Sequence, residues 1–379
     1  MIDNQFHVQR YFCLLSGENP ELAAFEFESI LSTLGISTQT KISPDSRVLE
    51  FWFLSKEKEN LFSKNASLLM KRVTMSHFCC HQLFQIDYHL YPPSTFNELI
   101  SLFDISVVQD LTPNRSFSVT TKRIGEPKGL FQNRDLTQRL SRFIGAQILE
   151  TNPSKNVNLD NPEEQFISIL SEHGFWFGHL ISYSLRREVR GRSVHKRPFF
   201  HPSSMNPLLQ RTMINLAALK PGEWLLDPFC GSGGALVEAS RMGIQSIGVE
   251  INRKMLWGAY QNLKADKIAN QLTSLVFGDA TQLSIRKGAI SAVVTDPPYG
   301  TASSTRGISL QKLLIHFFHE IYPLLSPRAR VVVAMPSHIK IEEQAARILN
   351  APYRSFLQYV HRSLTRKILV FTVSKGSNY

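Results

Sequence analysis

The tetrapeptide Asp296-Pro297-Pro298-Tyr299 brings together groups that can handle an amine on a flat aromatic ring. Such an amine is a poor nucleophile, because its lone pair is delocalised into the ring. The Asp296 carboxylate and the Pro297 carbonyl can accept its N–H bonds, and the prolines stiffen the turn that aims them. Tyr299 offers a ring for stacking. We therefore expect a catalytic corner in which the amine attacks a carbon and Asp296 removes a proton. The alternative is a Pro-rich turn without chemistry.

A glycine-rich stretch from Asp227 to Gly234 precedes this tetrapeptide. It follows a short apolar run ending in Leu225 and Leu226, and an apolar helical pattern comes after it. Strand, Gly-rich turn and helix open a doubly wound sheet of the nucleotide-binding type. The stretch has neither the third glycine of a dinucleotide fingerprint nor the Gly-Lys-Ser/Thr of a phosphate loop. With Asp227 ahead of its glycines, it resembles the first motif of class I methyltransferases that use S-adenosylmethionine. A tight turn without a ligand is the alternative.

Polar residues also end the next predicted strands. Glu250 ends the run 246–250, where an acid meets ribose hydroxyls in such folds, and Asp279 ends the run 275–280, where an acid commonly contacts adenine. Either acid alone could instead cap a helix. Residues just ahead of the sheet could wall the methionine end of the cofactor, although His201 could equally cap a turn. The residues expected to bind S-adenosylmethionine are Phe200, His201, Pro202, Asp227, Pro228, Phe229, Gly231, Gly233, Glu250, Ile251, Asp279 and Ala280.

The elements around these motifs predict an α/β fold. The run 292–295 is the strand that ends in the tetrapeptide, and 330–335 continues the alternation of strands and helices. The runs 356–361 and 368–373 predict a closing hairpin, which is typical of methyltransferase sheets. We expect a class I Rossmann-fold methyltransferase domain with a seven-stranded doubly wound sheet and a terminal antiparallel hairpin. A small polar loop, 301–306, could close over the base.

Composition limits the class of protein and its partners. The chain of 379 residues carries a formal net charge of +11, and a basic balance of this size favours a polyanionic partner. Its four cysteines include no Cys-x-x-Cys pair, so we expect a reducing compartment and no structural metal. Neither a signal peptide nor an apolar stretch of membrane-spanning length is visible. We therefore expect a cytoplasmic protein with no membrane partner.

The first half reads as further domains. Residues 1–70 follow a β-α-β-β-α order, which predicts a ferredoxin-like domain. In residues 71–184, the stretch Val157–Pro162, a strand and a hairpin at Gly174 resemble the end of the THUMP domain of tRNA-modifying enzymes, although the family usually has an acid where this chain has Asn158. Residues 185–205 form a basic linker, and 206–379 the methyltransferase domain.

Basic side chains are interleaved through the second of these domains and concentrated in the linker. Such residues can track phosphates, although for each one a solvated surface position is the alternative. The residues expected to contact RNA are Arg115, Lys122, Arg123, Arg134, Arg142, Arg186, Arg187, Arg190, Arg192 and Arg197.

The order of these parts points to one family. THUMP-like segment, basic linker and the motifs RPFFHPSSMNP, DPFCGSGG and TDPPYG resemble the archaeal tRNA (guanine(10)-N2)-methyltransferase family. The resemblance implies transfer of one or two methyl groups from S-adenosylmethionine to N2 of guanosine 10. It places the catalytic role on the tetrapeptide and implies tRNA, and a small zinc-binding activator subunit, as partners.

Other activities share the same motifs. The DPPY tetrapeptide also occurs in DNA adenine-N6 and cytosine-N4 methyltransferases, so it identifies the amine rather than the base. The alternatives are a guanine-N2 methyltransferase for another tRNA position such as the acceptor stem, a DNA amino-methyltransferase, and an RNA-binding protein with a vestigial catalytic domain. The additional domains of this chain lie N-terminal to the catalytic motifs. A DNA enzyme usually has its base-flipping domain inserted in the catalytic region or following it.

Overall fold

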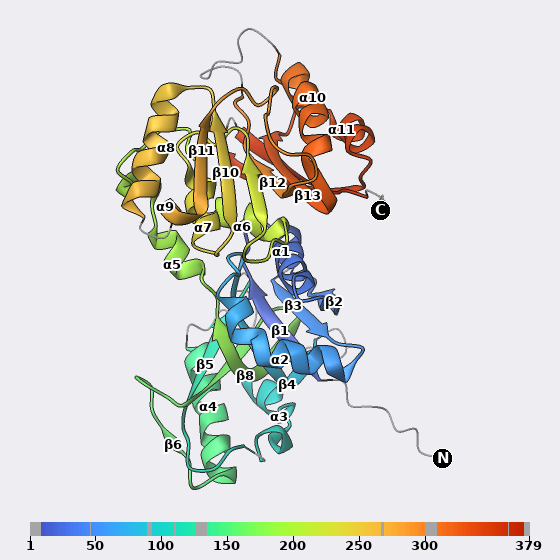
Figure 1. Ribbon diagram of the computed structural model, residues 1–379. Coiled ribbons are helices and arrows are strands. Elements are labelled where there is room, and N and C mark those ends of the chain that lie inside the picture. Colours follow the sequence, from blue (N-terminus) through green and yellow to red (C-terminus); the bar gives the residue numbers. More distant parts are fainter. Residues whose placement is uncertain are drawn as a thin grey trace. The chain divides into compact units, whose positions relative to one another are not determined.

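The computed structural model describes residues 9–45, 47–88, 93–109, 111–125, 135–266, 269–299, 309–362 and 364–374. Its chain divides into two compact units, shown with their elements in Figure 1. The first comprises residues 1–20, 36–71 and 76–184, and the second comprises 21–35, 72–75 and 185–379. Two expectations, the RNA contact of Arg134 and the loop 301–306, lie outside the described residues.

The first unit is built on an eight-stranded sheet of order β2-β3-β1-β4-β8-β7-β5-β6. Neighbouring strands are antiparallel except that β5 runs parallel to β6 and β7. The sheet continues across residue 70, since β1 pairs with β4, so the expected ferredoxin-like and THUMP segments share one sheet. Their division into two domains stays a prediction. The strands are β1 Arg10–Leu15, β2 Gln39–Ile42, β3 Val48–Trp52, β4 Ser76–Asp87, β5 Ser116–Arg123, β6 Asn156–Val157, β7 Glu164–Leu170 and β8 Gly174–Tyr183.

A helix of the first unit, α4, buries one apolar face against the sheet. In α4, Leu136–Thr151, the buried residues Leu140, Ile144 and Ile148 recur every four positions, as expected for a helix that packs one face on a sheet. They join Phe117 and other sheet residues in a single apolar cluster. The other helices are α2 Lys56–Met70, α3 Phe96–Ser101 and the 3₁₀ helix η1 Ile105–Val108.

The second unit contains the seven-stranded sheet, of order β11-β10-β9-β12-β13-β15-β14. Its first five strands are parallel, and β15 runs antiparallel to both β13 and β14. This confirms the expected doubly wound sheet with a terminal antiparallel hairpin. The strands are β9 Trp224–Asp227, β10 Gln245–Glu250, β11 Thr273–Phe277, β12 Ile290–Thr295, β13 Leu325–Pro336, β14 Tyr353–His361 and β15 Leu364–Thr372.

Helices cover this sheet, and Figure 1 shows α8 beside β11, with α10 and α11 near β13. Phe317 and Phe318 of α10 are fully buried against Leu226, Val293 and other strand residues. Helix α1 of the chain's beginning also belongs to this unit. The helices are α1 Pro20–Ser32, α5 Arg186–Gly191, α6 Pro207–Leu216, α7 Gly234–Ser240, α8 Arg253–Ala265, α9 Ala269–Leu272, α10 Leu310–Ile321 and α11 Glu342–Leu349, with 3₁₀ helices η3 Val194–Lys196 and η4 Tyr322–Leu324.

Two local features differ from the simplest sequence expectation. The segment 185–205 is not extended throughout, because it contains α5 and η3. Strand β11 ends at Phe277, so Asp279 lies in the turn after the strand rather than at its last position. Among the described residues, no helix is both long and apolar enough to cross a bilayer.

Candidate active site

A pocket opens at the carboxyl ends of β9 and β12, where the strand order of the second sheet reverses. Doubly wound sheets bind their ligands at this switch point. Its empty space, including the mouth open to solvent, is about 570 Å³. The lining residues are Ser203, Ser204, Met205, Gln210, Met213, Asp227, Phe229, Cys230, Gly231, Ser232, Gly234, Ala235, Met255, Val294, Thr295 and Asp296.

The glycine-rich turn forms one wall of this pocket. Gly231 and Gly233 have φ values of 53° and 76°, which side chains rarely tolerate. A Cβ on Gly233 would also lie 3.0 Å from that of Ala259 in α8. The Gly231 amide donates to Glu250 Oε2 at 2.9 Å, so the carboxylate at the end of β10 holds the turn in place. The backbone can therefore approach a ligand closely along this wall.

Asp227 lies buried at the floor of the pocket, at the end of β9. Its Oδ1 accepts from Thr295 Oγ1 at 2.7 Å and from the Phe229 amide at 3.3 Å. Burial raises the pKa of Asp227 to about 7, with smaller contributions from the negative charges of Glu250 and Asp296. Acidic groups on neighbouring strand ends therefore give the pocket a negative field, which favours a cationic ligand.

The tetrapeptide forms a corner at the end of β12. The Tyr299 hydroxyl donates to Asp296 Oδ1, and Arg366 Nη2 donates to Asp296 Oδ2 at 3.0 Å. Arg366 Nε donates to the Tyr299 hydroxyl at 2.9 Å, and the guanidinium carbon lies 5.6 Å from the centre of the Tyr299 ring. Burial raises the pKa of Asp296, while Arg366 and the hydrogen bond from Tyr299 act to lower it.

Arg366 was not among the residues expected from the sequence. It comes from β15, the strand of the closing hairpin, and is almost fully buried. A sequence signal does exist, because the adjacent basic residues Arg366 and Lys367 lie directly before the apolar run Ile368–Phe371 of the same strand. Buried charged residues are rare unless they are paired, so such a pair marks a position with a specific partner.

The segment ahead of the sheet is fastened to α8 by Phe199. Its amide donates to Asn262 Oδ1 at 2.9 Å, and Asn262 Nδ2 donates to the Phe199 carbonyl at 3.0 Å. The ring packs on Gly258 so closely that a Cβ there would overlap it. Asn262 also donates to the Ser232 carbonyl at 2.9 Å, which links this segment to the glycine-rich turn.

The residues after Phe199 differ in whether they line the pocket. Phe200 is 40 % exposed and packs on the ring of His195. His201 Nδ1 pairs with Ser203 Oγ at 2.7 Å and accepts from the Ser203 amide, as a turn-capping side chain does. The pocket lining includes Ser203, Ser204 and Met205 but not Phe200, His201 or Pro202.

Of the other residues expected to bind the cofactor, Asp227, Phe229 and Gly231 line the pocket, and Glu250 bonds to its wall. Pro228, Gly233, Ile251, Asp279 and Ala280 are not in the lining. The turn that carries Asp279 lies next to β10, because the Gly278 amide donates to the Glu250 carbonyl at 3.2 Å. Asp279 Oδ1 accepts from the Thr281 amide and hydroxyl at 2.9 Å and 2.8 Å.

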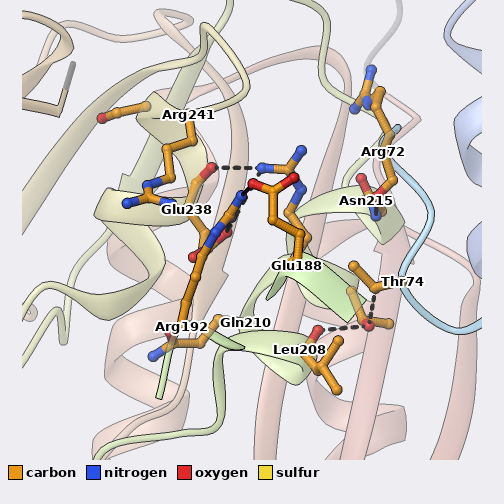
Figure 2. A network of polar contacts seen from close by, with 12 residues as sticks. Arg72, Thr74, Glu188, Arg192, Leu208, Gln210, Asn215, Glu238 and Arg241 are labelled. Atoms are coloured by element: carbon orange, nitrogen blue, oxygen red, sulfur yellow. Dashed lines mark hydrogen bonds and ion pairs between the residues drawn. The ribbon is translucent and has the colours of Figure 1, made fainter. Parts of the chain in front are cut away.

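Several arginines of the basic linker contact protein groups. Arg192 Nη1 donates to the buried Glu238 of α7 at 2.8 Å, and its Nη2 pairs with Glu188, as Figure 2 shows. Arg186 is buried and donates to the Thr74 carbonyl at 3.0 Å. Arg197 Nη2 donates to Gln210 Oε1 at 3.3 Å. These guanidinium groups tie the linker to other parts of the second unit.

The other described basic residues that we expect to contact RNA lie at or near the surface of their units. Arg187 and Arg190 are exposed on α5. Arg115, Lys122 and Arg142 are exposed in the first unit, where Arg115 lies 3.8 Å from Glu164, and Arg123 is partly buried. The contact of each with RNA stays a prediction.

Comparison with known proteins gives matches over most of the chain. A family model described as an RMKL-like methyltransferase domain matches residues 194–368, and one described as a DNA methylase matches 115–261. The tRNA (guanine(10)-N2)-dimethyltransferase of Methanothermobacter thermautotrophicus is 34% identical over 62% of this chain and 68% of its own length. That of Methanocaldococcus jannaschii is 28% identical over 73% and 76%. The crystal structure of SMU.472 complexed with SAH, 14% identical, superposes with a TM-score of 0.52 over 98% of this chain and 99% of its own, which shows the shared fold.

Proposed function

The chain belongs to the tRNA (guanine(10)-N2)-methyltransferase family, and we propose that it transfers methyl groups from S-adenosylmethionine to the exocyclic N2 amine of guanosine 10 in tRNA. It is an S-adenosylmethionine-dependent enzyme. The observation that carries the proposal is the identity of 34% to a tRNA (guanine(10)-N2)-dimethyltransferase, combined with an aspartate-proline corner at the edge of the pocket. Products with one or two methyl groups are both compatible with this corner.

The pocket suits the cofactor by its place in the sheet and by its charge. Glycines at positive φ let backbone amides approach it, and the negative charges of Glu250 and Asp296, which also act on Asp227, favour a positively charged sulfonium. When bound, S-adenosylmethionine supplies the electrophilic methyl group. We propose that the twelve residues expected from the sequence hold it, together with Ser203, Ser204 and Met205, which line the same pocket.

The corner then holds the amine. Asp296 lines the pocket, and each of its oxygens accepts one hydrogen bond, so lone pairs remain for the N–H groups of guanine N2. The Pro297 carbonyl supplies the second acceptor and Pro298 stiffens the turn. Because the amine becomes strongly acidic as it is alkylated, Asp296 need not be a strong base to remove its proton. Most of the rate enhancement comes from aligning amine, methyl carbon and sulfur.

A methyl-transfer assay tests this function. Purified protein, labelled S-adenosylmethionine and unmodified tRNA should give labelled N2-methylguanosine, with nucleoside mapping placing it at position 10. Asp296→Ala should abolish the labelling and leave cofactor binding largely intact. Label at another guanosine would favour the acceptor-stem alternative, and label that survives Asp296→Ala would contradict the role of the corner.

The DNA alternative rests on the match of a DNA methylase model to residues 115–261, which stops before Asp296. The same assay on duplex DNA separates the two activities. We expect no transfer to adenine or cytosine. Transfer to DNA but not to tRNA would overturn the proposed function.

We propose a small zinc-binding activator subunit as a partner in addition to tRNA. On α8, Trp257 is 61 % exposed and stacks on Tyr260 with ring centres 5.3 Å apart. Phe277, on β11 at the edge of the sheet, is 51 % exposed. Exposed aromatic groups beside an edge strand suit a protein partner that extends the sheet. Trp257→Glu with Phe277→Glu should prevent co-purification with the subunit, whereas Leu54→Glu, at an exposed site in the first unit, should not.

We also propose a cytoplasmic location. Cys13, Cys79, Cys80 and Cys230 are all buried free thiols, which suits a reducing compartment. Cell fractionation with an antibody against this chain tests it, and recovery in a secreted fraction would contradict it.

A further inference from the structure

We propose that Arg366 is a positioning residue for the methyl transfer, because it orients the Asp296 carboxylate and the Tyr299 hydroxyl that receive the target guanine. The role rests on the proposed function and adds a residue that the sequence motifs do not contain. Arg366 lies on β15, on the antiparallel side of the sheet, and reaches back to the corner at the end of β12.

The contacts close into a ring. Arg366 donates from Nη2 to Asp296 and from Nε to Tyr299, and Tyr299 donates its own proton to the other oxygen of Asp296. A guanidinium has a rigid planar fork, so it sets the directions of both partners at once. The ring leaves lone pairs on the carboxylate for the amine and holds the plane of Tyr299. Arg366 thereby orients Asp296 without saturating it.

The positive charge of Arg366 also affects the ionisation of Asp296. Among the described residues, the charged and titratable groups that face Asp296 are Asp227 from β9, Tyr299 from its own loop and Arg366 from β15. Burial raises the pKa of Asp296 and so disfavours its carboxylate form, whereas the Arg366 guanidinium and the hydrogen bond from Tyr299 favour that form. A protonated Asp296 would point an O–H donor at the N–H donors of the amine and could not accept the released proton. Arg366 therefore opposes the effect of burial and favours the ionised form of the acceptor.

The step itself balances without any group beyond substrate, cofactor and Asp296. The bond between N2 and the methyl carbon forms while the bond between that carbon and sulfur breaks, and its electron pair stays on sulfur. The proton released from N2 passes to Asp296 and from there to water. Arg366 does not touch the reacting atoms, which distinguishes it from a catalytic residue.

Lys367 offers a matched control on the same strand. It is also buried and basic, but its Nζ donates to the Ile339 carbonyl at 2.9 Å and pairs with Glu342 of α11. Lys367→Gln therefore disturbs the same strand without removing a partner of Asp296. A purely structural role of Arg366 would make the two substitutions behave alike.

The experiment compares Arg366→Gln, Arg366→Lys, Lys367→Gln and the unmodified protein in single-turnover transfer to tRNA across pH. For Arg366→Gln we expect the transfer rate to fall by at least roughly 10-fold. We also expect the acidic limb of its pH–rate profile to move to higher pH. The affinity for S-adenosylhomocysteine, measured by calorimetry, should stay unchanged. Arg366→Lys should restore part of the rate and return the limb toward its original pH. Lys367→Gln should lower the Tm but leave the pH–rate profile unchanged.

The outcomes separate this inference from the function beneath it. Absence of transfer to tRNA by the unmodified protein would overturn the proposed function. An active unmodified protein together with an Arg366→Gln variant of unchanged rate and profile would overturn only the role of Arg366. So would a Lys367→Gln variant with the same displaced limb. If Arg366→Gln does not fold, the profile of Arg366→Lys decides, since an unaltered acidic limb and rate would contradict the role.

Discussion

The Thr295 hydroxyl donates to the buried Asp227 carboxylate at 2.7 Å, joining the ends of β12 and β9 at the floor of the pocket. These adjacent strands carry the glycine-rich turn and the DPPY corner, so the bond links the cofactor wall to the amine site. Asp227 sits where burial opposes its charge, and this has a measurable consequence for stability.

The stability of the cofactor-free protein should depend on pH through Asp227. Its pKa rises from 3.8 in the unfolded chain to about 7 in the folded one, so between these values the folded state holds a proton that the unfolded state has released. The free energy of unfolding therefore falls as pH rises through this window. Asp227→Asn cannot ionise and should escape the fall.

The measurement is the difference in Tm between Asp227→Asn and the unmodified protein at about pH 5 and at about pH 8. The difference should favour the variant more at the higher pH. Comparing two pH values cancels the constant cost of changing the hydrogen bonds with Thr295 and Phe229. An equal difference at both would show that Asp227 is already ionised at the lower pH.

Gly258→Ala should loosen the wall of the cofactor pocket. The Phe199 ring occupies the space of the added methyl group, so the variant must displace it, at a cost of about 1–3 kcal/mol of folding free energy. Because Phe199 anchors the segment that leads to Ser203 and Met205, S-adenosylhomocysteine should also bind more weakly. Chemical denaturation and calorimetry measure the two effects.

Gly145→Ala is the control for this substitution. Gly145 lies inside α4 with nothing within 4 Å of an added Cβ, and its φ is not positive. The change should stabilise the protein by about 0.4–1 kcal/mol and leave cofactor binding unaltered. Equal effects of the two substitutions would contradict the packing of Phe199 on Gly258.

The two acidic partners of Arg192 should differ sharply in their importance. Glu238 is 1 % exposed and also lies 3.7 Å from Arg211, whereas the Glu188 side chain is 63 % exposed. Glu238→Ala leaves buried guanidinium groups without their counter-charge and should cost about 3–5 kcal/mol. Glu188→Ala should cost about 0–1 kcal/mol. Urea unfolding of both variants checks this, and similar costs would contradict the buried pair of Figure 2.

Exposed arginines of the linker should contribute to tRNA binding by charge alone. Arg187→Gln and Arg190→Gln should each weaken binding and reduce the slope of log K against log salt concentration by about 1. Arg186→Gln should instead lower the Tm, because Arg186 is buried and donates to the Thr74 carbonyl. Filter binding at several salt concentrations measures the slopes. Lys64→Gln, an exposed charge on α2, serves as the control and should leave the slope unchanged.

Much of the pocket could be predicted from local pattern. An acid or a glycine-rich turn at the end of each parallel strand must reach the same edge of the sheet, since parallel strands point the same way. Asp227, Gly231 and Asp296 line one pocket for this reason. The closing hairpin was predicted from the apolar runs 356–361 and 368–373, and the structure gives its strands as Tyr353–His361 and Leu364–Thr372.

Adjacent residues of the same type occupy different environments in the structure. Phe199 and Phe200 are neighbours of the same type, but only Phe199 finds a glycine on α8 to pack against. Arg186 and Arg187 are likewise identical in sequence terms, yet one is buried and the other exposed. No periodicity in a short irregular segment carries that information, so the sequence did not reveal that Ser203–Met205 line the pocket while Phe200–Pro202 lie outside its lining.

The chain's sequence by itself determined the family, the methyl-donor chemistry and the strand ends that meet at the pocket, because these depend on short motifs and on the alternation of strands and helices. Only the tertiary structure decided that β15 lies between β13 and β14, and so that Arg366 reaches Asp296 and Tyr299. The physical reason is that strand order in a sheet follows from how whole layers pack, and a contact across that order joins residues with no local relationship in the chain.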